Sequence, residues 1–277
     1  MAGLLDTASS LHGSIDTLTY EQSYEGTVYD KQAFVYVPDS YSPARPMNVL
    51  YLTHGWWGNA AGLAAGVAPV VDKLEASGEV SPTIVVFATY YPDRSFATDD
   101  YEEDYALNRF FATTEIDTLI STVESRYTTF ARGDLSDASL RASRRHRAFG
   151  GFSMGATTTW DVFALRPQYF YGYMPMAGES WIGREEDADF PRIAELVTDG
   201  ALRAGYGPSD FRILASVGSE DPALWDMTPQ LDELYQDYPD LMTESSLQVW
   251  IDEGESHSMA SVGNQVAHNL PLLFPHS

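Results

Sequence analysis

Cysteine is absent from the 277 residues of this chain, which excludes disulfide bonds, thiolate metal ligands and cysteine nucleophiles. Basic residues are scarce: the chain has 16 lysines and arginines but 40 aspartates and glutamates, which gives a formal net charge of −24. So acidic a chain repels nucleic-acid backbones and anionic membranes, and we expect neither as a partner. No apolar run approaches the roughly 18 residues of a membrane span. Neutral or weakly charged substrates are therefore favoured.

Hydrophobic residues make up 44% of the chain and aromatic residues 13%, which is ample for a packed core. From residue 30 onward, short apolar and β-branched runs alternate with longer amphipathic segments, a pattern typical of an α/β fold with a mostly parallel sheet. The predicted strands are 32–37, 48–53, 83–89, 146–151, 171–177, 212–218 and 247–252. The predicted helices are 102–127, 155–166, about 189–204, 228–237 and 258–270.

Neither an internal repeat nor a low-complexity linker divides the sequence. We therefore expect one domain over residues 1–277, with residues 1–19 as an ordered or frayed N-terminal extension. The first residues lack the basic and apolar segments of an export signal. The composition does not decide whether the protein is cytoplasmic or extracellular. The oligomeric state is equally open.

A candidate nucleophile stands in the motif Gly151-Phe-Ser153-Met-Gly155. A serine that attacks a carbonyl must project from the backbone, and a sharp strand-to-helix turn flanked by small residues allows this. The preceding "HRAFG" reads as a strand and the following "ATTTWDVFAL" as a helix. The motif with both flanks predicts that Ser153 is a nucleophile.

Serine needs a neighbouring base at neutral pH, and the chain contains six histidines. Four lie near the termini or within predicted strands and helices, which leaves His54 and His257. His257 follows the strand 247–252, in the loop "DEGESHSM". The chain order of serine, acid and histidine in α/β-hydrolases selects His257 as the base, and His54 is interpreted as a structural turn residue.

The acid is expected in "RILASVGSEDPALW", where a strand ends in a turn that carries Glu220 and Asp221. Either carboxylate could hold the imidazole, and Asp221 is preferred because a proline follows it. Asp226 and Asp252 remain alternatives. The acid would fix the tautomer of the base and stabilise its protonated form.

The negative charge that develops on an attacked carbonyl needs preset donors. The turn "HGWWG", residues 54–58, follows the strand 48–53 directly, so the backbone N–H of Trp56 is one candidate donor. The backbone N–H of Met154, the residue after the nucleophile, is its expected partner.

Two charged segments are interpreted as solvent-facing. Arg141, Arg144, Arg145 and Arg147 form a basic cluster that we expect to be a solvated loop. The run "DDYEED" at 99–104 lacks the glycine and ligand spacing of a calcium loop, and it reads as a solvated helix start. Histidine pairs with metal-ligand spacing are missing from the sequence, so neither a metal nor another cofactor is expected.

The sequence resembles the feruloyl esterase type of carbohydrate esterase, an esterase D-like group of the α/β-hydrolase superfamily. The resemblance is carried by "FVYVPDSYSP", "NVLYLTHGWWGN", "HRAFGGFSMGATTTW", "MPMAGESW", "GSEDPA" and the loop of His257, and it runs from about residue 20 to the C-terminus. It implies an α/β-hydrolase fold, Ser153, Asp221 and His257 as catalytic triad, and Trp56 and Met154 as oxyanion donors.

The resemblance also implies a substrate, an ester of a hydroxycinnamic acid with a plant cell-wall polysaccharide such as xylan. Trp57, Trp181 and Trp225 follow predicted strands, where they could line a pocket for a flat aromatic acid or a small feruloylated oligosaccharide. Other enzymes with this triad, namely acetyl xylan esterases, S-formylglutathione hydrolases and acyltransferases, remain alternatives. An inactive hydrolase fold that binds polysaccharide is the alternative from another class.

Overall fold

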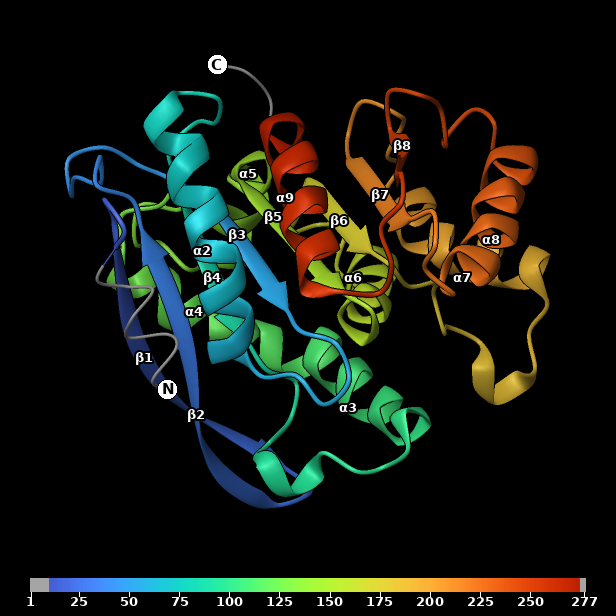
Figure 1. Cartoon of the computed structure of the whole chain (residues 1–277), viewed down its shortest axis with the longest axis horizontal. Helices are drawn as coiled ribbons and strands as arrows, with labels where there is room; N and C mark the ends of the chain where they lie inside the picture. The colour runs from blue at the N-terminus through green and yellow to red at the C-terminus, as the bar shows by residue number, and fades with distance from the viewer. Residues whose placement is uncertain (1–9, 275–277) are drawn as a thin grey trace.

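One sheet of eight strands organises residues 10–274, the part of the chain that the computed structural model describes (Figure 1). The strands are β1 (Ser14–Tyr24), β2 (Thr27–Val37), β3 (Asn48–Thr53), β4 (Thr83–Ala88), β5 (Arg147–Phe152), β6 (Gly172–Met176), β7 (Arg212–Gly218) and β8 (Leu247–Asp252). Their spatial order is β1-β2-β4-β3-β5-β6-β7-β8. The pairs β1/β2 and β2/β4 are antiparallel and all other neighbours are parallel. The predicted α/β-hydrolase fold is confirmed.

The N-terminal hairpin is the main departure from the prediction. β1 was not expected, and β2 begins at Thr27 instead of residue 32. The two strands turn at Glu25 and Gly26, both with positive φ, which suits a tight hairpin. β1 alternates polar and half-buried side chains at the edge of the sheet, so it lacks the apolar run by which the inner strands were found. Residues 1–9 of the expected extension lie outside the described residues.

The central strands β3, β4, β5 and β6 are buried along their whole length, as expected for parallel strands covered on both faces. The bounds of β3, β7 and β8 agree with the prediction. Those of β4 differ by one residue at its end, and those of β5 and β6 differ by one residue at both ends. The apolar runs locate these strands because every side chain in them packs against a helix or a neighbouring strand.

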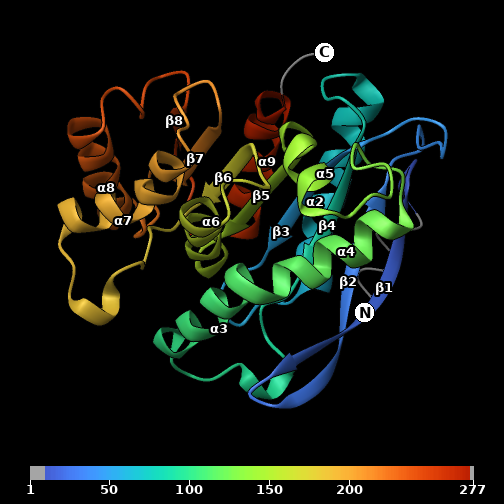
Figure 2. The same cartoon turned by 180° about the vertical axis from the view of Figure 1, so that it is seen from behind.

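Helices cover both faces. They are α2 (Ala60–Ser77), α3 (Tyr105–Phe110), α4 (Ile116–Arg126), α5 (Asp137–Ala142), α6 (Met154–Leu165), α7 (Phe190–Arg203), α8 (Leu224–Asp237) and α9 (Met259–Leu273), with short helical turns at η1 (Arg94–Phe96), η2 (Tyr101–Asp104), η3 (Phe111–Glu115), η4 (Arg144–His146) and η5 (Arg184–Glu186). α2 and α9 lie on the face toward the viewer in Figure 1, and α3, α4 and α6 lie on the opposite face in Figure 2.

Helix α2 was not predicted from the sequence. Two glycines and Pro69 lie within it, and these residues weaken the helical pattern. Gly66 has a packing reason, because a Cβ there would lie 2.6 Å from Cε of Met259 on α9. The side chain of Asn59 caps the helix by accepting the N–H of Gly62.

The segment predicted as one helix over 102–127 is interrupted. It consists of η2, α3, a π-helical turn at η3 and α4. The interpretation of 99–104 as a solvated helix start is wrong at Asp104, which is fully buried. Its Oδ2 accepts hydrogen bonds from the hydroxyls of Tyr91 (2.6 Å) and Tyr90 (3.1 Å). The sequence did not distinguish the buried Asp104 from the other acidic residues of this run.

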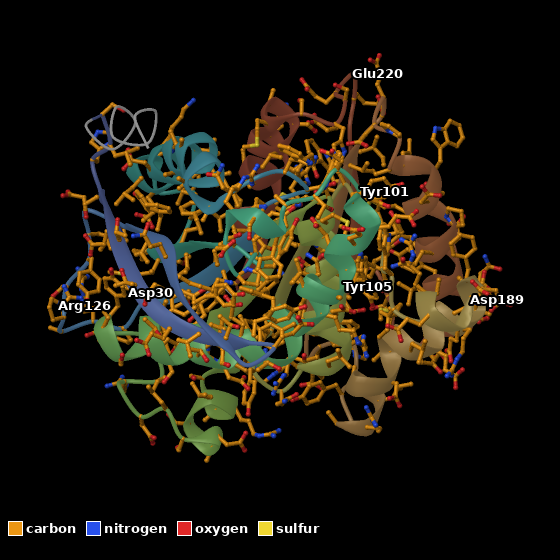
Figure 3. All side chains as sticks on the ribbon, turned by 90° about the horizontal axis from the view of Figure 1, so that it is seen from below. Asp30, Tyr101, Tyr105, Arg126, Asp189 and Glu220 are labelled. Carbon is orange, nitrogen blue, oxygen red and sulfur yellow. The ribbon has the colours of Figure 1, made fainter. Side chains whose placement is uncertain are left out.

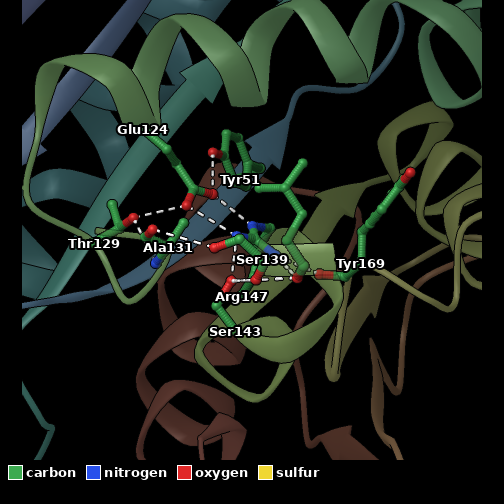
Figure 4. A network of polar contacts seen from close by, with 9 residues as sticks. Tyr51, Glu124, Thr129, Ala131, Ser139, Ser143, Arg147 and Tyr169 are labelled. Atoms are coloured by element: carbon green, nitrogen blue, oxygen red, sulfur yellow. Dashed lines mark hydrogen bonds and ion pairs between the residues drawn. The ribbon is translucent and has the colours of Figure 1, made fainter. Parts of the chain in front are cut away.

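The basic cluster is also only partly a surface feature. Arg141 and Arg145 are exposed, but Arg147 begins β5 and is buried. Its Nε and Nη2 donate to the two carboxylate oxygens of Glu124 at 2.5 and 2.9 Å, and Nη1 donates to the carbonyls of Leu140 and Tyr169 (Figure 4). Arg144 is buried as well, and its guanidinium donates to the carbonyls of Pro167 and Phe170 in the loop after α6, the latter at 2.8 Å. These arginines tie the start of β5 to its surroundings. The expectation of a solvated loop is wrong for both.

Within residues 10–274, no helix combines the length and apolarity needed to cross a membrane.

Candidate active site

The candidate nucleophile lies in a strained turn between β5 and α6. Ser153 has φ 57° and ψ −118°, which is unusual for a residue with a side chain. A Cβ on Gly151 would lie 2.3 Å from the carbonyl oxygen of Gly155, and a Cβ on Gly155 would lie 2.4 Å from that of Thr53. Both flanking positions therefore require glycine. The N–H of Ser153 donates to the carbonyl of Met176 (2.9 Å), which anchors the turn to β6.

The candidate base and acid are hydrogen-bonded to each other. Nδ1 of His257 lies 2.9 Å from Oδ2 and 3.0 Å from Oδ1 of Asp221. The Asp221 side chain is fully buried, while that of His257 is 37% exposed. Since an ionised carboxylate only accepts, Nδ1 carries the proton and Nε2 is the nitrogen that can take one up. The ring of Phe152 packs 4.4 Å from the His257 ring and supports it.

The other carboxylates considered for the acid have different positions. Glu220 is exposed, and Figure 3 shows it at the edge of the molecule. Asp252 accepts the hydroxyl of Ser261 at 3.2 Å. In the described part of the chain, no hydrogen bond joins His257 to Glu220, Asp226 or Asp252. Asp221 is therefore the carboxylate that holds the imidazole.

Ser153, Asp221 and His257 line one pocket of about 430 Å³. They reach it from the carboxyl ends of β5, β7 and β8, the edge at which open α/β sheets bind ligands. Among the hydrogen bonds of residues 10–274, none joins the Ser153 hydroxyl to His257. Such contacts are often long in free enzymes and shorten with substrate.

The two candidate oxyanion donors also line this pocket. Trp56 lies in the turn after β3, and Met154 is the first residue of α6. The first N–H groups of a helix have no partner within the helix, and they lie at the positive end of its dipole. No hydrogen bond of the described residues uses the backbone N–H of Trp56. A Cβ on Gly55 would lie 2.9 Å from Cβ of Ser153, so this turn packs directly against the candidate nucleophile.

His54 has a structural environment. Its ring is buried, and burial lowers its pKa to about 4, so it is neutral. Nδ1 lies 2.8 Å from the carbonyl of Gly55, and Nε2 lies 2.7 Å from the hydroxyl of Thr89. A carbonyl only accepts, so Nδ1–H donates to Gly55 and Nε2 accepts from Thr89. Both ring nitrogens are occupied in shaping the turn.

The three tryptophans expected at the substrate differ in position. Trp181 lines the pocket, and its Nε1–H donates to Oε1 of Glu179 at 2.5 Å. Trp57 and Trp225 are not among the lining residues, and Trp225 is 79% exposed. Trp57 instead donates its Nε1–H to the carbonyl of Thr98 at 2.7 Å. Trp56 also follows a predicted strand, and it lines the pocket in addition to being a candidate backbone donor.

Tyr101 and Glu179 are among the lining residues that were not identified from the sequence. Tyr101 lies within the acidic run at 99–104, and its ring is 5.8 Å from that of Trp181 and 5.9 Å from that of Trp56. Figure 3 shows Tyr101 near Tyr105, whose ring also contacts Trp181 at 5.9 Å. Glu179 was visible in "MPMAGESW", two residues before Trp181. Burial raises the pKa of its carboxyl.

The lining of the pocket contains carboxylates, a histidine and aromatic rings but no lysine or arginine. Within residues 10–274, no group of three or more histidine, aspartate or glutamate side chains is arranged to hold a metal ion. The arrangement is suited to nucleophilic attack by a serine on a neutral carbonyl compound with a flat apolar part.

A family profile described as "Putative esterase" matches residues 28–262. The chain belongs to this esterase family. Its homologues are serine hydrolases, and the matched region contains Ser153, Asp221 and His257.

Two curated relatives are enzymes of xylan degradation by name. Endo-1,4-beta-xylanase Y of Acetivibrio thermocellus is 29% identical over 261 residues, which cover 92% of this chain. An endo-1,4-beta-xylanase/feruloyl esterase of Xylanibacter ruminicola is 27% identical over 185 residues, which cover 63% of it. This chain spans 23% of the length of each relative.

A solved structure with the same fold is a serine-to-alanine mutant of the feruloyl esterase module from Clostridium thermocellum, complexed with sinapinate. It superposes with a TM-score of 0.82 at 26% identity, and the alignment covers 100% of this chain and 94% of that one.

Proposed function

We propose that this esterase hydrolyses esters of hydroxycinnamic acids with plant cell-wall polysaccharide, with Ser153 as nucleophile, His257 as general base and acid, and Asp221 as the orienting carboxylate. The observation that carries the proposal is that the hydrogen-bonded pair of Asp221 and His257 lines the same pocket as Ser153. The aromatic side chains of Trp56, Tyr101 and Trp181 line this pocket too.

In the first half-reaction, Nε2 of His257 takes the hydroxyl proton of Ser153 as Oγ attacks the ester carbonyl carbon. The carbonyl π bond becomes an oxyanion, which the N–H groups of Trp56 and Met154 stabilise. As the intermediate collapses, His257 gives its proton to the alcohol oxygen and the C–O bond to the alcohol breaks. An acyl ester on Ser153 remains.

In the second half-reaction, water replaces the alcohol. His257 takes a proton from the water while the water oxygen attacks the acyl carbon. The N–H groups of Trp56 and Met154 stabilise the second oxyanion. The bond to Ser153 Oγ then breaks, and His257 returns the proton to the serine. The product is a carboxylic acid, which ionises at neutral pH.

The acyl group is inferred from the wall of the pocket. Trp181 is restrained at its N–H by Glu179 and on its ring by Tyr101, Tyr105 and the guanidinium of Arg184, which lies 4.0 Å above it. A rigid indole face suits a planar cinnamoyl group better than an acetyl group, because flat rings bury more area against each other. The sinapinate complex of the related module and the xylanase relatives support this substrate class.

A panel of three substrates tests the proposal: methyl ferulate, an acetylated xylo-oligosaccharide and S-formylglutathione. We expect kcat/KM to be highest for methyl ferulate. Trp181→Ala should lower kcat/KM for methyl ferulate about tenfold and leave that for the acetyl ester within about twofold. A preference for the acetyl ester or the thioester would contradict the cinnamoyl assignment. Turnover that survives Ser153→Ala would contradict the whole mechanism.

A further inference from the structure

A second cavity of about 420 Å³, here called the side compartment, adjoins the catalytic pocket. The two cavities share Glu179, Trp181 and Asp226 as a common wall. The side compartment does not contain Ser153, Asp221 or His257 among its lining residues. Each cavity is within the size range of small-ligand sites, roughly 300 to 1,000 Å³. A ligand that occupies both would therefore have its reacting group on one side of Trp181 and another part on the other side.

We propose that the side compartment binds neutral sugar residues of the polysaccharide whose ester is cleaved in the catalytic pocket, with Phe190 as the stacking surface. This inference rests on the proposed function, because it concerns the carbohydrate part of the same substrate. The proposed sugar site is separate from Ser153, Asp221 and His257, which do not line the side compartment.

The lining of the side compartment combines apolar surface with hydrogen-bonding groups. Phe190, Ile182 and Ile193 supply the apolar part, and Arg184 and Asp187 supply polar groups. Sugars present both characters, since the C–H face of a pyranose or furanose ring is apolar and its hydroxyls donate and accept hydrogen bonds. A purely apolar ligand would offer the Asp187 carboxylate no hydrogen-bond donor.

The charges of the side compartment favour a neutral ligand. Glu179, Asp187 and Asp226 line it together with a single arginine, Arg184. The Arg184 guanidinium already pairs with Oε2 of Glu102 at 2.7 Å and lies over the Trp181 ring. An anionic sugar such as a uronate would meet carboxylates without a free cation, so it should bind more weakly.

The backbone of Phe190 is held by the start of α7. It is the first residue of this helix, and the side chain of the preceding Asp189 caps the helix by accepting the N–H of Arg192 at 3.1 Å. Figure 3 shows Asp189 on the outer side of the molecule, away from Tyr101 and Tyr105. Phe190 remains 38% exposed despite its size. An exposed aromatic ring beside a polar cavity is suited to stacking against a sugar.

The test compares a feruloylated arabinoxylo-oligosaccharide with methyl ferulate. Phe190→Ala should raise KM for the oligosaccharide about fivefold, a loss of about 1 kcal/mol, and leave both constants for methyl ferulate within about twofold. Phe190→Trp should restore the oligosaccharide KM. Leu202→Ala is the matched control, because Leu202 lies on the same helix, is 48% exposed and lies outside both cavities. An equal change for both substrates in Phe190→Ala, or no change for either, would overturn the inference.

A binding experiment separates this inference from the proposed function. Unesterified arabinoxylo-oligosaccharide is titrated into the wild-type chain and into Phe190→Ala by calorimetry. Binding that weakens about fivefold in the variant supports the side compartment even if no cinnamoyl ester is hydrolysed, which would contradict only the proposed function. Absence of binding to the wild type, or equal binding to both, overturns the side compartment even if methyl ferulate is hydrolysed.

Discussion

The hydroxyl of Tyr91 accepts a hydrogen bond from the backbone N–H of Trp57 (3.2 Å) and donates to Oδ2 of the buried Asp104 (2.6 Å). Trp57 has φ 59°, a conformation that a bulky residue rarely adopts without support. Arg94 adds to this support by donating to the carbonyls of Trp57 and Gly58 at 2.9 and 2.7 Å. The turn that contains the proposed oxyanion donor Trp56 is thus held by the segment after β4.

Tyr91→Phe should therefore lower kcat without changing the fold. The substitution removes the acceptor of the Trp57 N–H, so the strained turn can relax and displace the N–H of Trp56. Loss of one such hydrogen bond corresponds to a decrease of about three- to tenfold in kcat, with KM nearly unchanged. Steady-state kinetics with methyl ferulate measures both constants.

Tyr235→Phe is the matched control for that variant. Tyr235 donates to the carbonyl of Leu247 at 2.7 Å, and it lies outside the lining of the catalytic pocket. Its loss should reduce stability by about 1 kcal/mol and leave kcat unchanged. Equal kcat values for the two variants would show that Tyr91 has no part in positioning the turn.

The elbow could be predicted because its constraint is local. The close approach of Gly151 to Gly155 and of Gly155 to Thr53 demands two glycines at fixed spacing, and this spacing is readable in the sequence. The inner strands were similarly visible, because burial on both faces makes them continuous apolar runs. β1 and α2 were missed because partner strands and helices, not local patterns, stabilise them.

The walls of the pocket could not be predicted in the same way. Trp181 and Trp225 both follow strands, yet Trp181 turns into the pocket and Trp225 toward solvent. Tyr101 and Asp104 stand three residues apart in one acidic run, and only the fold directs Asp104 inward to the two tyrosine hydroxyls. Side-chain direction in loops depends on contacts with residues distant in the chain.

The backbone at Ser153 stores strain that a stability measurement should detect. Ser153→Ala and Ser153→Gly both remove the nucleophile, so both should abolish detectable turnover. Glycine adopts φ 57° without a steric penalty, whereas alanine does not. The free energy of unfolding of Ser153→Gly should exceed that of Ser153→Ala by about 1 kcal/mol, after the greater flexibility of unfolded glycine is included. Urea denaturation of the two variants measures this difference; if alanine is the more stable, the elbow is not strained.

Asp221→Asn should reduce kcat by about three to four orders of magnitude. An amide can donate to Nδ1, which favours the tautomer with the proton on Nε2 and removes the site that accepts the serine proton. Glu220→Gln is the control, because it changes the neighbouring exposed carboxylate and should leave kcat unchanged. Circular dichroism spectra of both variants should match the wild type. A large loss in Glu220→Gln with a small one in Asp221→Asn would reverse the assignment of the acid.

Asp161 should make stability depend on pH. It lies on α6, fully buried, and burial raises its pKa to about 7, against a usual value of 3.8. Its Oδ1 accepts from the Tyr105 hydroxyl at 3.4 Å and lies 3.7 Å from Arg109. Among the described residues Oδ2 has no hydrogen-bond partner. Between pH 4 and 7 the folded state therefore binds this proton more tightly than the unfolded state does.

The free energy of unfolding should accordingly fall as the pH rises through this window and then level off above pH 7. From pH 5 to pH 8 the contribution of Asp161 is a loss of about 2 to 3 kcal/mol. The side chain at position 161 in Asp161→Asn carries no charge at any of these pH values. The free energy of unfolding of Asp161→Asn minus that of the wild type should therefore increase by about 2 to 3 kcal/mol between pH 5 and pH 8. Asp232→Asn, at an exposed position, should follow the wild-type curve. Urea denaturation at pH 5, 6, 7 and 8 measures these differences. Parallel curves for wild type and Asp161→Asn would mean that the Asp161 carboxyl is not protonated in the folded protein.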